Sequence, residues 1–137
     1  MYQTTIHLKT SGEGDVIDIT PFVLDAVSKS GTETGIVHLF VVGSTAALTT
    51  IEYEPGAVAD LRKALSRIAP SDAIYAHDDR WGDGNGRSHV RAAIIGPSLS
   101  IPVVEKRLLN GTWQQIVLVE LDIRHARERS VVVTILP

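Results

Sequence analysis

The sequence has 137 residues, of which 44% are hydrophobic, and a formal net charge of −3, so it can form one domain with its own core. It has no surplus of basic residues for contacting a phosphate backbone, and a nucleic-acid partner is not expected. The absence of cysteine excludes disulfides, thiolate metal ligands and thiol chemistry. No secretory signal or membrane-spanning apolar run is evident, which predicts a cytoplasmic protein without a membrane partner.

The N-terminal part alternates β-forming and polar residues, as a half-buried strand does, over residues 4–10 and again over 16–19. A turn containing two glycines separates these predicted strands at 11–15. Thr20 followed by Pro21 is typical of a helix start, with the threonine hydroxyl as the cap. Gly31 supplies the stop, so we predict a helix over 21–30.

Residues 36–42 form a nearly continuous β-branched and aromatic run, which predicts a strand covered on both faces. His38 lies inside this run with few polar neighbours in the sequence. We interpret it as a hydrogen-bonded core or interface histidine and give it no role in a site.

A second helix is predicted to begin at Pro55 and to end before Pro70. Its apolar positions recur on one stripe, at Val58, Leu61, Leu65 and Ile68. Residues 101–104, 115–121 and 130–136 read as three further strands. Together these elements predict a single α+β domain over 1–137, with two main helices and largely antiparallel sheets.

Most side chains suited to chemistry lie between residues 75 and 120. His77 and His89 are candidate ligands for a divalent metal, because neutral imidazole is the commonest nitrogen ligand. Carboxylates that could complete or orient such a site are Asp78, Asp79, Asp83 and Glu120. The alternative is a pair of surface histidines on a mobile loop.

The glycine-rich segment 82–89 offers exposed backbone N–H groups beside Arg87, a combination that can hold a phosphate or carboxylate. A flexible hairpin connection is the alternative. Ser44, Thr45 and Thr49 either bind a substrate through their hydroxyls or cap and pad a strand end. A Ser-His-acid triad is not favoured, because the G-x-S-x-G turn is absent.

Five segments taken together resemble the YjbQ family, also called uncharacterised protein family 0047. They read GSTAALTTIE, EPG, YAHDD, NGRSHVRAAIIGPSLSIPV and GTWQQIVLVELD. The most specific match comprises Ser98, Ile101, Val103 and residues 111–114. The resemblance implies a small α+β fold, a homotrimer and secondary thiamine-phosphate synthase activity. That reaction joins a hydroxymethylpyrimidine diphosphate to a thiazole phosphate and releases pyrophosphate.

The resemblance also implies a histidine cluster that holds a divalent metal, zinc or magnesium, with His77 and His89 at two of its positions. This chain departs from the family in two places. Gly43-Ser44 stands where many members have His-Thr or His-Ser, so one histidine is missing. Arg127 and Arg129 match a final Asp-Gly-Pro-Arg-x-Arg only after an apparent two-residue insertion.

From the residues and the resemblance together, we predict catalytic roles for His77, His89 and Glu120 and metal ligation by the two histidines. Glu120 is a ligand, a general base with a raised pKa, or one partner of a buried ion pair. The predicted substrate-binding residues are Ser44, Thr45, Asn85, Arg87, Arg91, Gln114, Arg127 and Arg129. The arginines are included because a departing diphosphate carries negative charge, which positive groups or a divalent cation would stabilise. Two alternatives to synthesis are a phosphometabolite-binding protein and a metal-assisted hydrolase.

Overall fold

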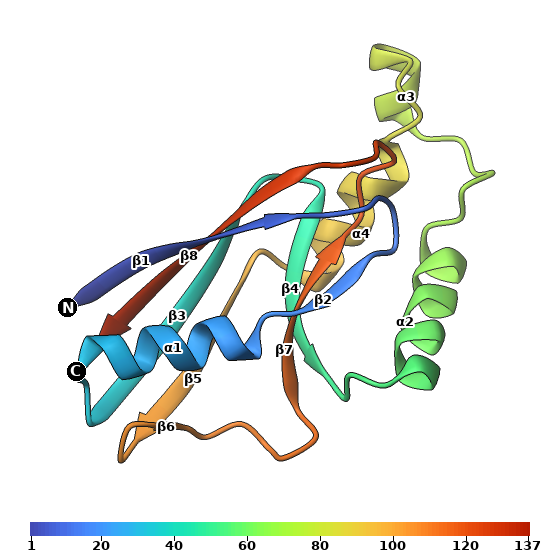
Figure 1. The fold of residues 1–137 in the computed structure, drawn as a ribbon. Helices are drawn as coiled ribbons and strands as arrows, with labels where there is room; N and C mark the ends of the chain where they lie inside the picture. The colour runs from blue at the N-terminus through green and yellow to red at the C-terminus, as the bar shows by residue number, and fades with distance from the viewer.

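Two antiparallel sheets and four helices make up the computed structural model, which describes residues 1–137 (Figure 1). The larger sheet has the strand order β1 (Tyr2–Lys9), β8 (Glu128–Leu136), β3 (Thr34–Val42), β5 (Ser98–Val104), β6 (Arg107–Leu108). The smaller sheet has the order β2 (Val16–Asp18), β7 (Gln115–Glu120), β4 (Ala46–Ile51). The helices are α1 (Thr20–Ser30), α2 (Pro55–Ile68), α3 (Ala76–Trp81) and α4 (Gly86–Ile95). The predicted α+β class with antiparallel sheets is confirmed.

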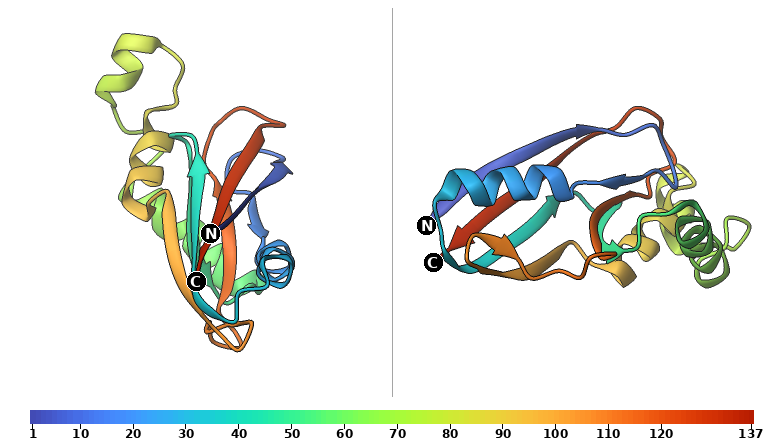
Figure 2. Two further views of the ribbon diagram at one scale, coloured as in Figure 1. Left: turned by 90° about the vertical axis from the view of Figure 1, so that its left-hand side faces the viewer. Right: turned by 60° about the horizontal axis from the view of Figure 1, so that its bottom comes forward.

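The main hydrophobic core lies between the two sheets, where α1 also packs. Val23 and Val27 of α1 meet Leu39 of β3 and Leu118 of β7 in this cluster. A second, smaller core covers the other face of the three-stranded sheet, where Val117 and Val119 of β7 join residues of α2 and α4. The three-stranded sheet is therefore the middle layer of the molecule (Figure 2).

The outer face of the five-stranded sheet has no helix over it, so the expectation that β3 is covered on both faces was wrong. Ile36 is 48% exposed and lies opposite Leu136 of β8, which is 46% exposed. Phe40 and Val42, on the same face, are also exposed. The apolar run in the sequence therefore reflects one core-facing side and one open apolar side.

The predicted helix over 21–30 is confirmed, but its start differs from the expected cap. Ile19 is the N-cap residue and makes no side-chain cap, while Thr20 is the first helical residue. The Thr20 hydroxyl instead accepts a hydrogen bond from the backbone N–H of Ile116, at 2.8 Å. It thus ties α1 to the start of β7.

Helix α2 begins at Pro55 as predicted. The Glu54 carboxylate caps it by accepting from the N–H groups of Gly56 and Ala57. Its stripe is only partly buried, because Val58 and Leu65 are buried whereas Ile68 is 58% exposed. The helix lies to one side of the three-stranded sheet (Figure 1).

The glycine-rich segment is not a hairpin, because its residues 82–85 form a short connection between two helices. Gly82, with φ of 65°, ends α3 in the left-handed conformation, and Gly86 is the first residue of α4. A Cβ on Gly86 would lie 2.5 Å from Cβ of Tyr75, so this position requires the bare backbone. The structure therefore places His77 and His89 on adjacent helices rather than on one loop.

Helix α3 projects from the end of the molecule beyond α4 (Figures 1 and 2). None of its six residues is buried, and Ile74 just before it is 92% exposed. Trp81, its last residue, is 66% exposed and lies beside the Arg80 guanidinium. Side-chain packing therefore contributes little to holding α3 in place.

Candidate functional site

A fully buried ion pair stands at the end of the smaller sheet, where β7 ends beside β8. Nη2 of Arg129 lies 2.5 Å from Oε1 of Glu120, and Nε lies 2.8 Å from Oε2. The Thr10 hydroxyl donates to the same carboxylate at 2.7 Å. Nη2 also donates to the Thr45 hydroxyl at 2.8 Å, which connects the pair to the start of β4.

Of the three roles considered for Glu120, the geometry is that of the buried ion-pair partner. Burial by itself raises the pKa of Glu120, but hydrogen bonds from Arg129, Thr10 and the Asp122 N–H outweigh it and leave that pKa below its ordinary value. Both oxygens are occupied and the side chain is 0% exposed. The other two roles, a metal ligand and a general base with a raised pKa, therefore do not fit this geometry.

Asp122 is the centre of the surrounding hydrogen-bond network. It is completely buried and accepts from Thr45 Oγ1, Asn85 Nδ2 and the side chains of Arg124 and Arg127. Burial acts to raise the pKa of Asp122, but the hydrogen bonds from Arg124, Thr45 and Asn85 hold it far below its usual range. The network brings together four of the predicted substrate-binding residues, namely Thr45, Asn85, Arg127 and Arg129.

The two predicted histidines do meet, through helices α3 and α4. Their ring centroids are 4.4 Å apart, with the planes tilted by 42°. Nδ1 of His77 lies 3.4 Å from Oδ1 of Asp83 and 3.5 Å from Oδ1 of Asp78. We call His77, Asp78 and Asp83 the acidic histidine cluster. One potential metal-ligand atom from each of them lies within 4.8 Å of the other two.

The acidic histidine cluster has a donor set suited to a divalent cation. His77 Nδ1 is buried and has no hydrogen-bond partner, which is unusual for a polar atom in a folded protein. Ligand atoms about 2.1 Å from a tetrahedral ion lie about 3.4 Å apart, which is the spacing between this nitrogen and the carboxylate oxygens. One imidazole and two carboxylates at this tetrahedral spacing suit zinc better than magnesium, which takes oxygen ligands in octahedral geometry. His89 lies alongside.

Asn85 joins the cluster to the buried network. Its backbone N–H donates to Asp83 Oδ1 at 3.1 Å, and its side-chain amide donates to Asp122 Oδ2 at 3.2 Å. Its own Oδ1 accepts from the Ile123 N–H. Because Asn85 is only 4% exposed, it fixes the spacing between a negatively charged region and an arginine-rich one.

Arg87 and Arg91 lie on α4 but are bound to the protein itself. Glu13 accepts two hydrogen bonds from Arg87, at 2.7 and 2.9 Å, and one from Arg91 at 3.0 Å. Arg91 also donates twice to the carbonyl of Ala69. The Arg87 hydrogen bonds, with the charges of both arginines, lower the pKa of Glu13 despite its partial burial. These two arginines therefore tie α4 to the β1–β2 turn.

Ser44 lies exposed on the turn between β3 and β4, close to Thr45 in the chain. Gln114 lies elsewhere, because it precedes β7 whereas Glu120 ends it. Six residues of strand separate them by roughly 20 Å. Gln114 donates to Thr50 Oγ1 at 3.0 Å and accepts from the Gly111 N–H, which shapes the turn before β7.

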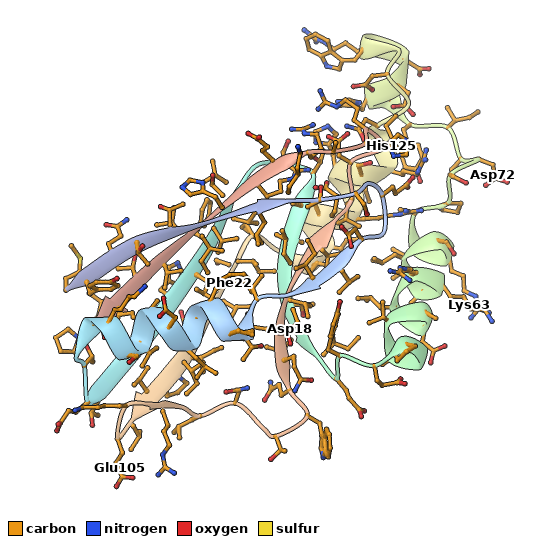
Figure 3. The ribbon with its side chains drawn as sticks, viewed as in Figure 1. Asp18, Phe22, Lys63, Asp72, Glu105 and His125 are labelled. Carbon is orange, nitrogen blue, oxygen red and sulfur yellow. The ribbon has the colours of Figure 1, made fainter.

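Sequence reasoning missed Glu13, Thr10 and Asp122 as members of this region. The sequence did contain a signal for Asp122, because it is a second acidic residue, two positions after Glu120, at the end of a predicted buried strand. Glu13 had no such signal, because it pairs with arginines 74 and 78 positions away. His125, at the same end of the molecule, reaches the carbonyl of Ser11 (Figure 3).

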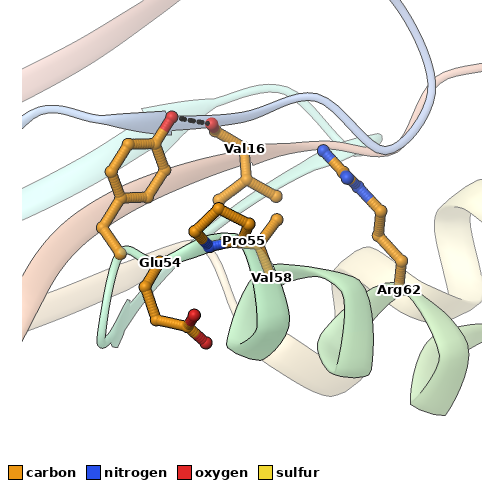
Figure 4. A pocket seen from close by; sticks show the side chains of 6 residues that line it. Val16, Glu54, Pro55, Val58 and Arg62 are labelled. Atoms are coloured by element: carbon orange, nitrogen blue, oxygen red, sulfur yellow. Dashed lines mark hydrogen bonds between the residues drawn. The ribbon is translucent and has the colours of Figure 1, made fainter.

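The cavity between β2 and α2 does not coincide with these residues. It has a volume of about 290 Å³ and is lined by Val16, Tyr53, Glu54, Pro55, Val58 and Arg62 (Figure 4). Two of its polar groups already have partners in the protein. The Tyr53 hydroxyl donates to the Val16 carbonyl, and Arg62 Nε donates to the carbonyl of Gly14.

Comparison with known sequences matches residues 4–137 to the family described as UPF0047 protein YjbQ-like. The UPF0047 protein of Methanothermobacter thermautotrophicus is 36% identical over 122 residues, covering 89% of this chain and 84% of the relative. The UPF0047 protein YjbQ of Salmonella typhimurium is 35% identical over 136 residues, covering 98% and 96%.

Solved structures show the same fold. A hypothetical protein from Aeropyrum pernix superimposes with a TM-score of 0.90 at 33% identity, covering 99% of this chain and 98% of that one. A YbjQ-like protein of unknown function from Sulfolobus solfataricus gives a TM-score of 0.85 at 34% identity, covering 96% and 95%. In this chain no helix is long and apolar enough to cross a membrane.

Proposed function

The chain belongs to the YjbQ-like family UPF0047, and we propose that it is a metal-dependent enzyme acting on a small phosphorylated metabolite. The named reaction is thiamine phosphate synthesis from a pyrimidine diphosphate and a thiazole phosphate, with release of pyrophosphate. The observation that carries the proposal is the partnerless buried Nδ1 of His77 beside two carboxylates.

The chemistry required is the stabilisation of negative charge on a departing diphosphate. A divalent cation held by His77, Asp78 and Asp83 would offset part of that charge. Arg127 supplies positive charge from the other side of Asn85, and the buried Asp122 fixes its orientation. His89 lies against His77, and in this proposal it would exchange a proton with the bound substrate.

The proposal is tested by assaying condensed product and pyrophosphate together, in chelated and metal-reloaded protein. We expect turnover only after reloading, and at least a hundredfold loss in His77→Ala and Asp83→Asn. Asp79→Asn is the matched control, because Asp79 is an exposed α3 residue outside the cluster. Full turnover in the chelated protein would refute metal dependence.

The same assay separates the two alternatives. Phosphate release without a condensed product would favour a metal-assisted hydrolase. Saturable binding of phosphorylated ligands without turnover of any kind would favour a phosphometabolite-binding protein. Both alternatives draw on the same residues, so the products formed decide between them.

We also propose that the working form is a cytoplasmic homotrimer, associated through the outer face of the five-stranded sheet. Support comes from the exposed apolar side chains there, which belong to Ile36, Phe40, Val42 and Leu136. Apolar surface of this kind is typical of an interaction site. The chemistry of this face favours self-association because it carries no Lys, Arg, Asp or Glu on β3.

Light scattering tests the assembly. The wild-type protein is expected at three times the chain mass, and Phe40→Asp is expected to dissociate because a charge would be buried in the interface. Ile68→Asp serves as the control, because Ile68 is an exposed apolar residue on α2 (58% against 43% for Phe40) away from this face. A wild-type monomer, or a trimer unaffected by Phe40→Asp, would contradict this assembly.

A further inference from the structure

The turn between β3 and β4 has hydrogen-bond donors that the protein leaves unused. The backbone N–H groups of Gly43, Ser44 and Thr45 donate to no backbone or side-chain acceptor. Gly43 and Ser44 are exposed, whereas Thr45 is 4% exposed. Successive backbone N–H groups in a turn form a concave site that favours anions.

Arg129 faces this same turn with one nitrogen free. Its Nε and Nη2 are held by Glu120 and Thr45, but Nη1 has no hydrogen-bond partner although the residue is only 3% exposed. A Cβ built on Gly43 would lie 2.9 Å from this Nη1. Gly43, with φ of 142°, therefore leaves a space beside the guanidinium that any other residue would fill.

The charge balance around the turn also favours an anion. Three guanidinium groups, of Arg124, Arg127 and Arg129, surround the two buried carboxylates of Glu120 and Asp122. These five side chains carry a net charge of +1, and the Asp83 carboxylate lies close enough to act on the exposed Arg124. Arg127 uses only Nη1 in its bond to Asp122, so its other nitrogens remain available to a ligand. By contrast, Arg87 and Arg91 are already engaged by Glu13 and the Ala69 carbonyl.

We propose that the Gly43–Thr45 turn and Arg129 Nη1 form a subsite for the terminal phosphoryl group of a phosphate ester. This inference rests on the proposed function, because it names the part of the substrate that binds away from the acidic histidine cluster. Asn85 touches both regions, through Asp83 and Asp122. A substrate would thus place its phosphoryl group on the arginine side of Asn85.

The test uses full-length protein freed of metal by chelation, so that anion binding is measured separately from metal binding. Inorganic phosphate and methyl phosphate are titrated in separate experiments while amide resonances are followed by NMR. Both ligands are expected to cause saturable shifts at Gly43, Ser44, Thr45 and the Nε of Arg129. Binding of inorganic phosphate alone would overturn the assignment to an ester.

Gly43→Ala is expected to weaken binding at least tenfold, because its Cβ would occupy the space beside Nη1. Gly96→Ala is the matched control, since Gly96 also has a positive φ, of 103°, but no atom within 4 Å of a Cβ there. Unchanged affinity in Gly43→Ala, or equal weakening in both variants, would overturn the inference. If Gly43→Ala does not fold, the wild-type titration decides instead. Phosphate-induced resonance shifts confined to residues outside the turn and Arg129 would overturn the inference.

His77→Ala separates this inference from the proposed function. It should retain phosphate binding while losing turnover. Phosphate binding at the turn in a protein that never binds metal would contradict the proposed function and leave the subsite standing. Metal-dependent turnover without any phosphate binding at the turn would contradict the subsite and leave the proposed function standing.

Discussion

Glu120 and Arg129 form the pair on which the arrangement of the site depends, because each would be an uncompensated buried charge without the other. We predict that Glu120→Gln lowers the free energy of unfolding by about 3–5 kcal/mol, the usual cost of removing one partner of a buried pair. Urea denaturation measures this. Glu105→Gln, which breaks an exposed pair with Arg107, should change stability by less than about 1 kcal/mol.

The lowered pKa values of Glu13, Glu120 and Asp122 make stability depend on pH. A carboxyl whose pKa is lower in the folded state stabilises the protein fully above its unfolded pKa, and that contribution is lost as the pH falls toward its folded pKa. We therefore expect the free energy of unfolding to fall as the pH drops below about 4.5. Urea titrations at several pH values test this, and a stability independent of pH below that point would contradict it.

From the sequence we could predict which residue types form the site, but only some of the contacts between them. His77 and His89 were chosen for their chemistry, and the structure brings them together although they are twelve positions apart. The sequence could not show which arginines are free, because that depends on Glu13, which comes from a turn far away in the chain. It also could not show that Gln114 lies at the opposite end of β7.

Among the elements, α4 was the hardest to predict, for a physical reason. Its buried face consists of Gly86, Ser88, Arg91 and Ala92, whereas Val90 and Ile94 are exposed. This reverses the usual pattern in which aliphatic residues mark the inner face of a helix. Six of the eight strands and α1 follow the usual pattern and were predicted within a few residues of their observed bounds, whereas β4 and β6 were not predicted.

Helix α3 carries His77 but has no buried residue, so we expect it to open locally far more often than the sheets. Hydrogen exchange in metal-free protein should be faster for α3 amides than for β7 amides by at least a hundredfold. Adding a divalent metal should slow exchange in α3, because a ligand that binds only the closed form stabilises it. Exchange in α3 unaffected by metal would contradict ligation by the acidic histidine cluster.

In the molecule as a whole, two sheets and four helices bring one histidine-carboxylate group and one arginine-rich group to the same end. The antiparallel α+β arrangement could be predicted from strand patterns, since these report which faces are buried. The pairing of β1 with β8 could not, because those strands are separated by nearly the whole chain. That pairing is what places Arg129 beside Thr10 and Glu120.

Ligation of a divalent metal by the acidic histidine cluster is tested by the metal content of the purified protein. Elemental analysis would be run on wild-type protein after reloading, beside His77→Ala, Asp83→Asn and the control Asp79→Asn. We expect about one divalent ion per chain in the wild type and the control, and loss of that ion in the other two. No bound metal in any sample, or equal metal in all four, would contradict it.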